Sequence, residues 1–158
     1  MRKLIFLSTI ALMLFACKSK SVTDSKPSIS SQVAMKGEWV LSSVTYPGSN
    51  YIKINSFQIA DSKCFEGSKW KFISNNNTGN MSFTNTSCTA FSSAFTWYVS
   101  KEGQFLLKIL YQGEKAKKVR EGFVLRVQDQ RESSFQLVDK VDVGGKMTDV
   151  VYQFNKIN

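Results

Sequence analysis

The chain has 158 residues, of which 42% are hydrophobic and 13% aromatic, which is enough apolar surface for one packed domain and too little for two. It carries 21 Lys and Arg against 12 Asp and Glu, a formal charge of +9, and it contains no histidine. Without imidazole, a Ser–His or Cys–His nucleophile and a typical catalytic zinc site are excluded within one chain. We therefore expect no catalytic residue, no metal and no cofactor.

The first sixteen residues have the pattern of a bacterial export signal. Arg2 and Lys3 supply positive charge, and a largely apolar stretch over 4–14 follows them. A helix needs about 20 apolar residues to span a bilayer, so this shorter stretch indicates a signal peptide over 1–16. The segment ends in Leu-Phe-Ala-Cys at 14–17, which resembles the lipobox of bacterial lipoproteins. The resemblance implies that Cys17 carries the lipid; the alternative is an ordinary secretory signal followed by a chance cysteine.

A polar, serine-rich stretch follows Cys17 and has no hydrophobic periodicity. It predicts a flexible tether over 17–34, with a reach of roughly 25 Å for about 18 residues. The residue after the cysteine is Lys18 and not the Asp that would change the sorting of such a lipoprotein. The acidic cluster that marks export to the cell surface is also missing after Cys17. By the usual sorting pattern of such lipoproteins, we expect the outer membrane, with the domain facing the periplasm.

From residue 35 to 158 the sequence predicts one all-β domain. Eight short segments alternate apolar with polar side chains and are joined by polar connections. They lie at 37–44, 69–72, 81–83, 94–98, 105–111, 123–128, 135–137 and 150–154. Turns are predicted at 75–79, 101–104 and 144–145, where Asn, Gly and charged residues gather. The stretch 51–63 alternates poorly, and we expect a long loop or a short helical lid there.

Consecutive strands with one apolar face favour an eight-stranded antiparallel up-and-down β-barrel, because closure hides the apolar faces and removes exposed strand edges. An eight-stranded barrel leaves an interior that side chains fill or that holds one small ligand. A two-sheet β-sandwich is the alternative fold.

Cys64 and Cys88 are the two cysteines that remain after export. If the predicted hairpin is centred near Asn76, these two positions face each other; matching Trp70 to Phe83 shifts the register by one residue, which a bulge absorbs. In an oxidising compartment we expect a disulfide, which would add roughly 3–4 kcal/mol by closing a loop of about 25 residues. The alternative, a redox-active thiol pair, needs a closer spacing than this one.

Three stretches carry a family resemblance that covers roughly residues 36–156. They are Gly-Glu-Trp-Val-Leu at 37–41, the run from Cys64 to Phe72, and the Asn-rich run at 75–80. Together they resemble the lipocalin-like domains of small lipoproteins in Bacteroidota-type bacteria, which implies a β-barrel and no established activity or ligand contacts. Gly37-x-Trp39 is also similar to the start of true lipocalins, where the Trp closes one end of the barrel. No arginine follows the last strand to stack on Trp39 and no C-terminal helix is predicted, so the domain is lipocalin-like rather than a lipocalin.

The leading functional hypothesis is non-enzymatic binding of a small apolar or amphipathic ligand. The alternation places many aromatic side chains on the inner faces of the strands; such side chains line ligand cavities, and they also simply fill small barrels. The candidate lining residues are Trp39, Trp70, Phe72, Phe95, Trp97, Phe105 and Phe123. The expected partner is the membrane, through lipid on Cys17. We expect no nucleic acid, because the lysines are scattered and their densest run, at 115–120, indicates a solvated turn.

The alternative function is a protein-interaction or inhibitor module of the cell envelope. Its contact tips would be the basic loop at 115–120 and the Asn-rich turn at 75–79. An enzyme is the third hypothesis, because carboxylates can pair across strands in ways that the sequence does not reveal. The candidate acids are Asp61, Glu66, Asp139, Asp142 and Asp149, and none forms a recognisable motif.

Overall fold

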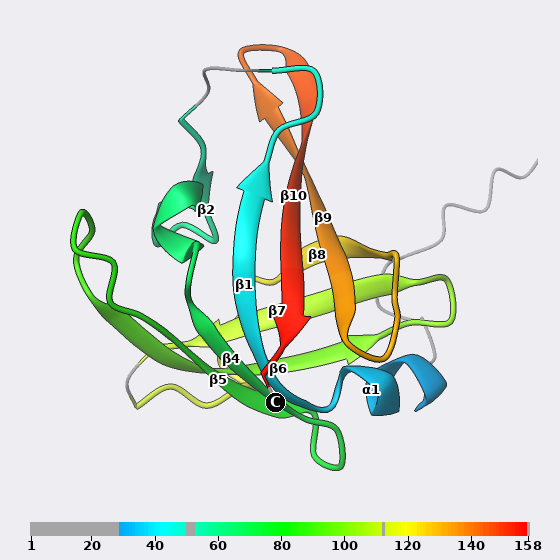
Figure 1. Ribbon diagram of the computed structural model, residues 1–158. Coiled ribbons are helices and arrows are strands. Elements are labelled where there is room, and N and C mark those ends of the chain that lie inside the picture. The colour runs from blue at the N-terminus through cyan, green and yellow to red at the C-terminus, as the bar shows by residue number, and fades with distance from the viewer. Residues whose placement is uncertain (1–28, 50–52, 112, 158) are drawn as a thin grey trace, which may run out of the picture.

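Figure 1 shows the computed structural model of the protein, which describes residues 29–49, 53–111 and 113–157. The predicted signal peptide, Cys17 and the first part of the predicted tether lie outside these residues. No helix among the described residues is both long and apolar enough to cross a bilayer.

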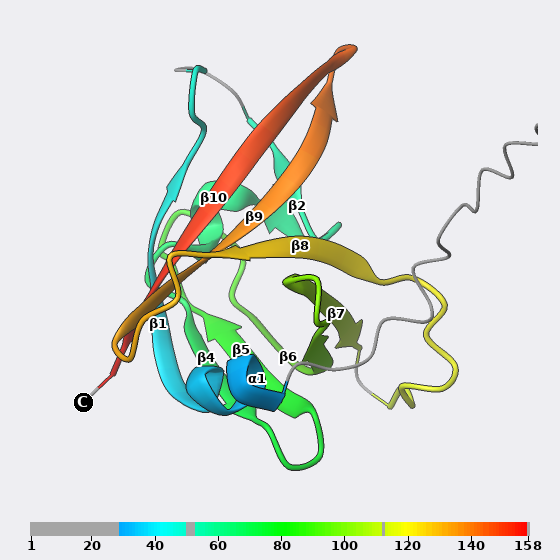
Figure 2. The ribbon, with the colours of Figure 1, turned by 90° about the vertical axis from the view of Figure 1, so that its right-hand side faces the viewer.

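The described residues form a closed antiparallel barrel of eight strands (Figures 1 and 2). The strands are β1 (Gly37–Thr45), β4 (Lys69–Ile73), β5 (Thr78–Phe83), β6 (Phe91–Val99), β7 (Gln104–Leu110), β8 (Phe123–Gln128), β9 (Ser134–Val143) and β10 (Lys146–Lys156). From β4 to β10 each strand pairs with the next, and β1 closes the barrel by pairing with both β10 and β4. The predicted eight-stranded up-and-down barrel is confirmed, and the sandwich alternative is wrong.

The first strand changes register partway along its length. Leu41 pairs with Phe154, whereas Ser43 pairs with Gln153, so a β-bulge lies between Leu41 and Ser43. A bulge inserts one extra residue and reverses the alternation beyond it. As a result Val44 is fully buried, not Ser43, which corrects the predicted inner face of this strand.

A short helix covers one end of the barrel, which we call the closed end. Helix α1 (Ile29–Met35) buries Gln32, whose Nε2 donates to Oδ1 of Asn77 at 3.0 Å and whose Oε1 accepts the backbone N–H of Val99 at 3.3 Å. Residues 29–34, which the sequence assigns to the tether, therefore belong to the packed domain. The polar face of this segment binds the barrel through hydrogen bonds, which hydrophobic periodicity does not reveal.

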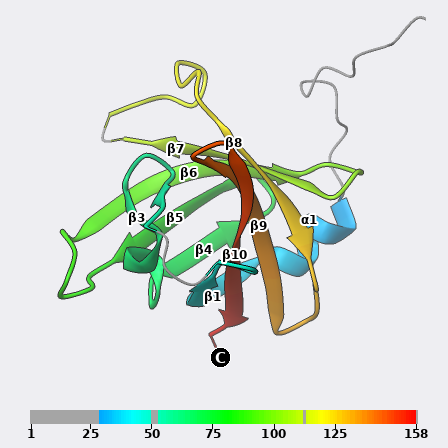
Figure 3. The ribbon, with the colours of Figure 1, turned by 90° about the horizontal axis from the view of Figure 1, so that it is seen from above.

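The opposite end, the mouth, is crossed by the segment between β1 and β4. This segment contains β2 (Asn55–Ser56), β3 (Ala60–Asp61) and the 3₁₀ helix η2 (Ser62–Phe65). The sequence predicts a long loop or a short helical lid over 51–63. The structure has a two-stranded turn followed by one short 3₁₀ helix, and residues 51 and 52 lie outside the described range. Figure 3, seen from above, shows this segment beside the barrel wall.

The predicted disulfide between Cys64 and Cys88 is present, with an S–S distance of 2.05 Å and a Cα–Cα distance of 5.9 Å. Its setting differs from the prediction, because Trp70 pairs with Met81 and not with Phe83. The two cysteines thus do not face each other across the β4–β5 ladder. The bond instead joins η2 to the connection between β5 and β6, and so fastens the mouth segment to the barrel wall.

Candidate ligand site at the barrel mouth

The predicted lining residues point into the barrel and pack against one another. Six of the seven are at most 1% exposed: Trp39, Trp70, Phe72, Phe95, Trp97 and Phe105. Phe72 lies at the centre, with its ring centroid 5.1 Å from that of Trp97 and 5.3 Å from that of Phe95. Rings in such contact fill the middle of the barrel as a packed core.

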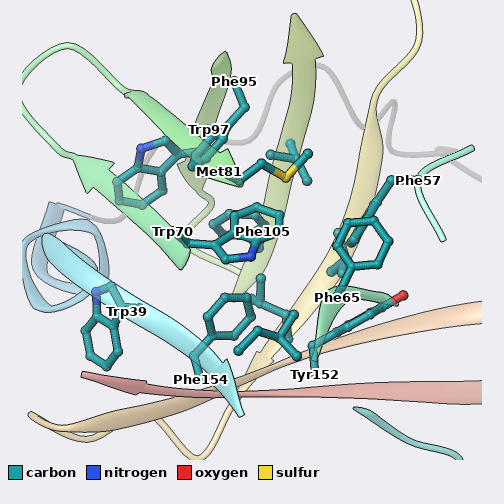
Figure 4. Close-up of a cluster of buried hydrophobic side chains, with 14 of the residues drawn as sticks. Trp39, Phe57, Phe65, Trp70, Met81, Phe95, Trp97, Phe105, Tyr152 and Phe154 are labelled. Atoms are coloured by element: carbon teal, nitrogen blue, oxygen red, sulfur yellow. The ribbon is translucent and has the colours of Figure 1, made fainter. Parts of the chain in front are cut away.

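Two of the seven lining residues, Trp39 and Phe123, sit at opposite ends of this core (Figure 4 labels Trp39 beside the helix). Trp39 lies at the closed end, where its indole N–H donates to the carbonyl of Met35 at 2.8 Å and its ring meets Phe135 edge-on at 4.7 Å. Phe123, at the start of β8, is half-buried and contacts Phe57 at the mouth. The structure thus separates a filled interior from a less tightly filled mouth.

Phe57 is the residue that closes the mouth, and sequence analysis did not single it out. It is 4% exposed, and its ring lies 5.3 Å from Phe65, 5.3 Å from Phe123 and 5.4 Å from Tyr152 between centroids. Figure 4 shows Phe57 above Phe65 and Tyr152, away from Trp39. Its only sequence signal is a single Phe in a polar, poorly alternating stretch.

The backbone that carries Phe57 is strained. Phe57 and Gln58 have φ angles of 54° and 57°, and the N–H of Ile59 donates to the carbonyl of Ser56 at 3.0 Å. Positive φ at both central residues is the type I′ turn, which favours Gly and Asn. A non-glycine residue in this left-handed conformation is destabilising by about 1–2 kcal/mol. Burial of the Phe57 ring contributes about 1.5–3 kcal/mol and offsets that cost.

Next to Phe57 the structure has a pocket of about 270 Å³. Its apolar wall is formed by Phe57, Ile109, Tyr111 and Phe123, and its outer wall by residues from the connection between β7 and β8. The charged residues of that outer wall are Glu114, Lys118, Arg120 and Glu121. Because two are acidic and two basic, the mouth pocket has no net charge of its own.

Polar groups gather on the inner wall beneath Phe57. The hydroxyls of Ser56 and Tyr152 lie 2.5 Å apart, and those of Tyr46 and Ser62 are also hydrogen-bonded. Burial raises the pKa of Tyr152 well above its usual range, although the bond to Ser56 opposes the shift. The phenol is therefore neutral at physiological pH, available as a donor or an acceptor.

Asp139 lies near this polar group. It follows Phe135 and Leu137 in the inward-facing alternation of β9. Its negative charge contributes to the raised pKa of Tyr152. Burial raises the pKa of the Asp139 carboxyl, and the backbone N–H of Lys140 lowers it by less. Among the described residues no cation forms an ion pair with Asp139.

The other candidate acids have local structural contacts. Asp61 caps η2, Glu66 pairs with Lys63 at 2.8 Å, Asp142 accepts the N–H of Gly145, and Asp149 pairs with Arg126 at 2.9 Å. They are spread over different elements, so the structure does not bring the predicted acids together at one site. Within the described ranges, no cluster of three or more His, Cys, Asp or Glu has a geometry that could hold a metal ion.

The two predicted contact tips differ in their surroundings. The turn at 75–79 is partly used in packing, because Asn77 accepts the hydrogen bond from Gln32 of α1. The run at 115–120 connects β7 with β8, and its Lys115, Lys117, Lys118 and Arg120 are all exposed, as a solvated turn requires.

Comparison with known proteins agrees with this architecture. Residues 35–124, more than half of the chain, match the family described as "Lipocalin-like domain". The described strands β9 and β10 lie beyond this match and complete the same barrel. A similar solved structure is that of a lipocalin-like protein from Bacteroides uniformis, with 13% identity, a TM-score of 0.49, and coverage of 78% of this chain and 99% of that chain. No curated protein matches the chain at a significant level. On the family match and the closed eight-stranded barrel, the chain belongs to the lipocalin-like domain family.

Proposed function

We propose that this protein is a lipid-anchored lipoprotein of the bacterial envelope that binds a small apolar or amphipathic ligand at the mouth of its barrel. The observation that carries the proposal is Phe57, a buried aromatic ring held over the mouth pocket by a strained turn. Backbone strain of this kind persists where the surroundings impose it, and it is concentrated at ligand clamps and switches.

The ligand would take the place of the Phe57 ring. That ring contacts Phe65, Phe123 and Tyr152, so its departure would expose an apolar surface with the Tyr152 hydroxyl at one side. The strain in the turn would be released at the same time, which lowers the free-energy cost of opening. A pocket of about 270 Å³ next to the ring would be enlarged towards the 300–1,000 Å³ that is usual for small-molecule sites.

The anchor follows from the Leu-Phe-Ala-Cys sequence at 14–17. The chain enters the domain through α1 at the closed end, so a lipid on Cys17 would leave the mouth at the far end from the attachment point. The outer membrane, with the domain in the periplasm, is the proposed location, and the Cys64–Cys88 disulfide is consistent with an oxidising compartment.

The ligand is tested first by native mass spectrometry of the full chain extracted from its own cells, in which we expect a bound small molecule. The mouth is then tested with Nile red, a neutral apolar dye. Phe57→Ala removes the ring and is expected to raise dye affinity severalfold, whereas Phe57→Trp fills the mouth and is expected to lower it. Gln58→Asn is the matched control, because it changes the other turn residue and Asn tolerates positive φ.

Equal dye affinity in the wild type and all three variants would contradict a ligand site at the mouth. The anchor has a separate test, in which cells are fed radiolabelled palmitate. The wild type is expected to incorporate label and to fractionate with the outer membrane, and Cys17→Ser to do neither. Labelling of both proteins, or of neither, would contradict lipid attachment at Cys17.

A further inference from the structure

The outer surface of the barrel carries a second hollow, distinct from the mouth. It lies over β6, β7 and β8, has a volume of about 550 Å³ and is roofed by residues from 116–122. Its floor is made by outward-facing side chains of the three strands: Thr96, Tyr98, Leu106, Lys108 and Val124. Val124 is 42% exposed, so its side chain presents apolar surface to this hollow.

The roof is held in place by one of the cations of the floor. Lys108 donates from Nζ to the carbonyl of Val119 at 3.2 Å, which ties the connection between β7 and β8 to the barrel wall. Arg120 and Phe123 are shared with the mouth pocket, whereas Lys117 lines only the outer hollow. The same connection therefore separates two hollows of different character.

The charge of the outer hollow is one-sided. Its described lining includes Lys108, Lys117 and Arg120 and no Asp or Glu. Lys117 and Arg120 are exposed, and neither forms an ion pair within the described part of the chain. The mouth pocket, by contrast, has two acidic and two basic residues.

We propose that this outer groove binds a free fatty acid, with its carboxylate between Lys117 and Arg120 and its acyl chain along Tyr98, Leu106 and Val124. The occupant must combine an anion with an apolar body, because Lys117 and Arg120 lie at the roof, whereas Tyr98, Leu106 and Val124 supply apolar surface on the floor. A volume of about 550 Å³ is in the range of small-molecule sites.

The test uses the full chain in phosphatidylcholine nanodiscs and a laurate analogue with a photoreactive diazirine on its acyl chain. After irradiation, mass spectrometry maps the labelled residues. We expect label on Tyr98, Leu106 or Val124, competition by unlabelled laurate but not by dodecanol, and weaker labelling at high salt, because exposed charge pairs are screened. Lys117→Glu/Arg120→Glu is expected to weaken binding about tenfold or more, since it turns attraction into repulsion.

Lys101→Glu/Lys115→Glu is the matched control, because it makes the same change in net charge at two exposed lysines outside the groove. Unchanged labelling in the Lys117/Arg120 variant, an equal loss in the control variant, or equal competition by dodecanol would overturn the proposal. Label confined to Phe57 and Ile109 would also overturn it while supporting the mouth site. Displacement of the label by phosphatidylglycerol nanodiscs, but not by free laurate, would assign the surface to membrane lipid instead and so overturn it.

Discussion

The ammonium group of Lys156 lies 5.8 Å from the centre of the Trp39 ring. The two residues are also cross-strand partners, Trp39 on β1 and Lys156 on β10, at the point where these strands join near the closed end. The sequence shows no arginine after the last strand to stack on Trp39. The structure has a lysine at the end of that strand, which supplies the cation from within the sheet itself.

Removing this cation should weaken the closed end. Lys156→Met keeps an unbranched side chain but loses the charge, and we expect the free energy of unfolding to fall by about 0.5–1 kcal/mol, the usual size of an exposed cation–π contact. Lys156→Arg should be neutral, because guanidinium also stacks on indole. Urea unfolding measures both, with Lys101→Met as the control for loss of an exposed lysine. Equal stability of the Met and Arg variants would contradict the contact.

Loss of the disulfide should destabilise the mouth segment and the whole domain. Cys64 and Cys88 are separated by 24 positions, so the chain-entropy model gives about 3–4 kcal/mol. We expect this loss in Cys64→Ala/Cys88→Ala, measured by urea unfolding. Dithiothreitol should lower the stability of the wild type to a similar extent and leave the double variant unchanged. A wild type that is insensitive to reductant while its thiols are fully reduced would contradict the prediction.

The barrel itself was predictable because its inside and outside differ so strongly. Alternation places Phe105 and Leu107 of β7 inside, and the structure buries both. Register was less predictable. In the β4–β5 turn, Asn75, Asn76 and Asn77 all tolerate positive φ, but only Asn77 adopts it, with φ of 55°. Which Asn adopts positive φ determines which residues of β4 and β5 pair with each other, and nothing local in the sequence distinguishes the three.

The candidate site was less predictable than the fold. Phe123 was expected among the lining residues, because it lies on an alternating strand, and it does line the mouth pocket. Phe57 lies in a segment without periodicity, and its position depends on contacts with residues as distant in sequence as Phe123 and Tyr152. Such contacts are tertiary, so neither propensity nor alternation reveals them.

Gly79 provides a test of how tightly the interior is filled. A Cβ at this buried strand position would overlap the ring of Phe95 and the backbone carbonyl of Lys71. We expect Gly79→Ala to lower the free energy of unfolding by about 1–3 kcal/mol, because overpacking a filled core forces side chains and backbone to shift. Ser82→Ala, on the outer side of the same strand, is the control and should change little. A stabilised Gly79→Ala variant would show that the interior has room.

Asp139 makes the stability of the domain depend on pH. Burial raises the pKa of its carboxyl in the folded state, so the folded protein holds this proton more tightly than the unfolded chain, whose Asp titrates near pH 4. Stability from this group is therefore complete below about pH 4 and is lost as the pH rises through the folded pKa. Asp139→Asn removes the ionisation, and we expect it to be more stable than the wild type at pH 7, with the difference shrinking towards pH 3.

Urea unfolding of both proteins from pH 3 to pH 8 measures this difference. Asp129→Asn is the matched control, because Asp129 is an exposed turn residue with φ of 47°, a conformation that Asn also tolerates. This control measures what replacing a carboxylate by an amide does to stability at an exposed position. An Asp139→Asn variant that is less stable than the wild type at pH 7 would mean that a donor or cation compensates the half-buried carboxylate. That outcome would contradict the prediction, because among the described residues the structure shows no ion-pair partner for the Asp139 carboxylate. A compensated Asp139 would then offer a ligand at the mouth no unpaired negative charge.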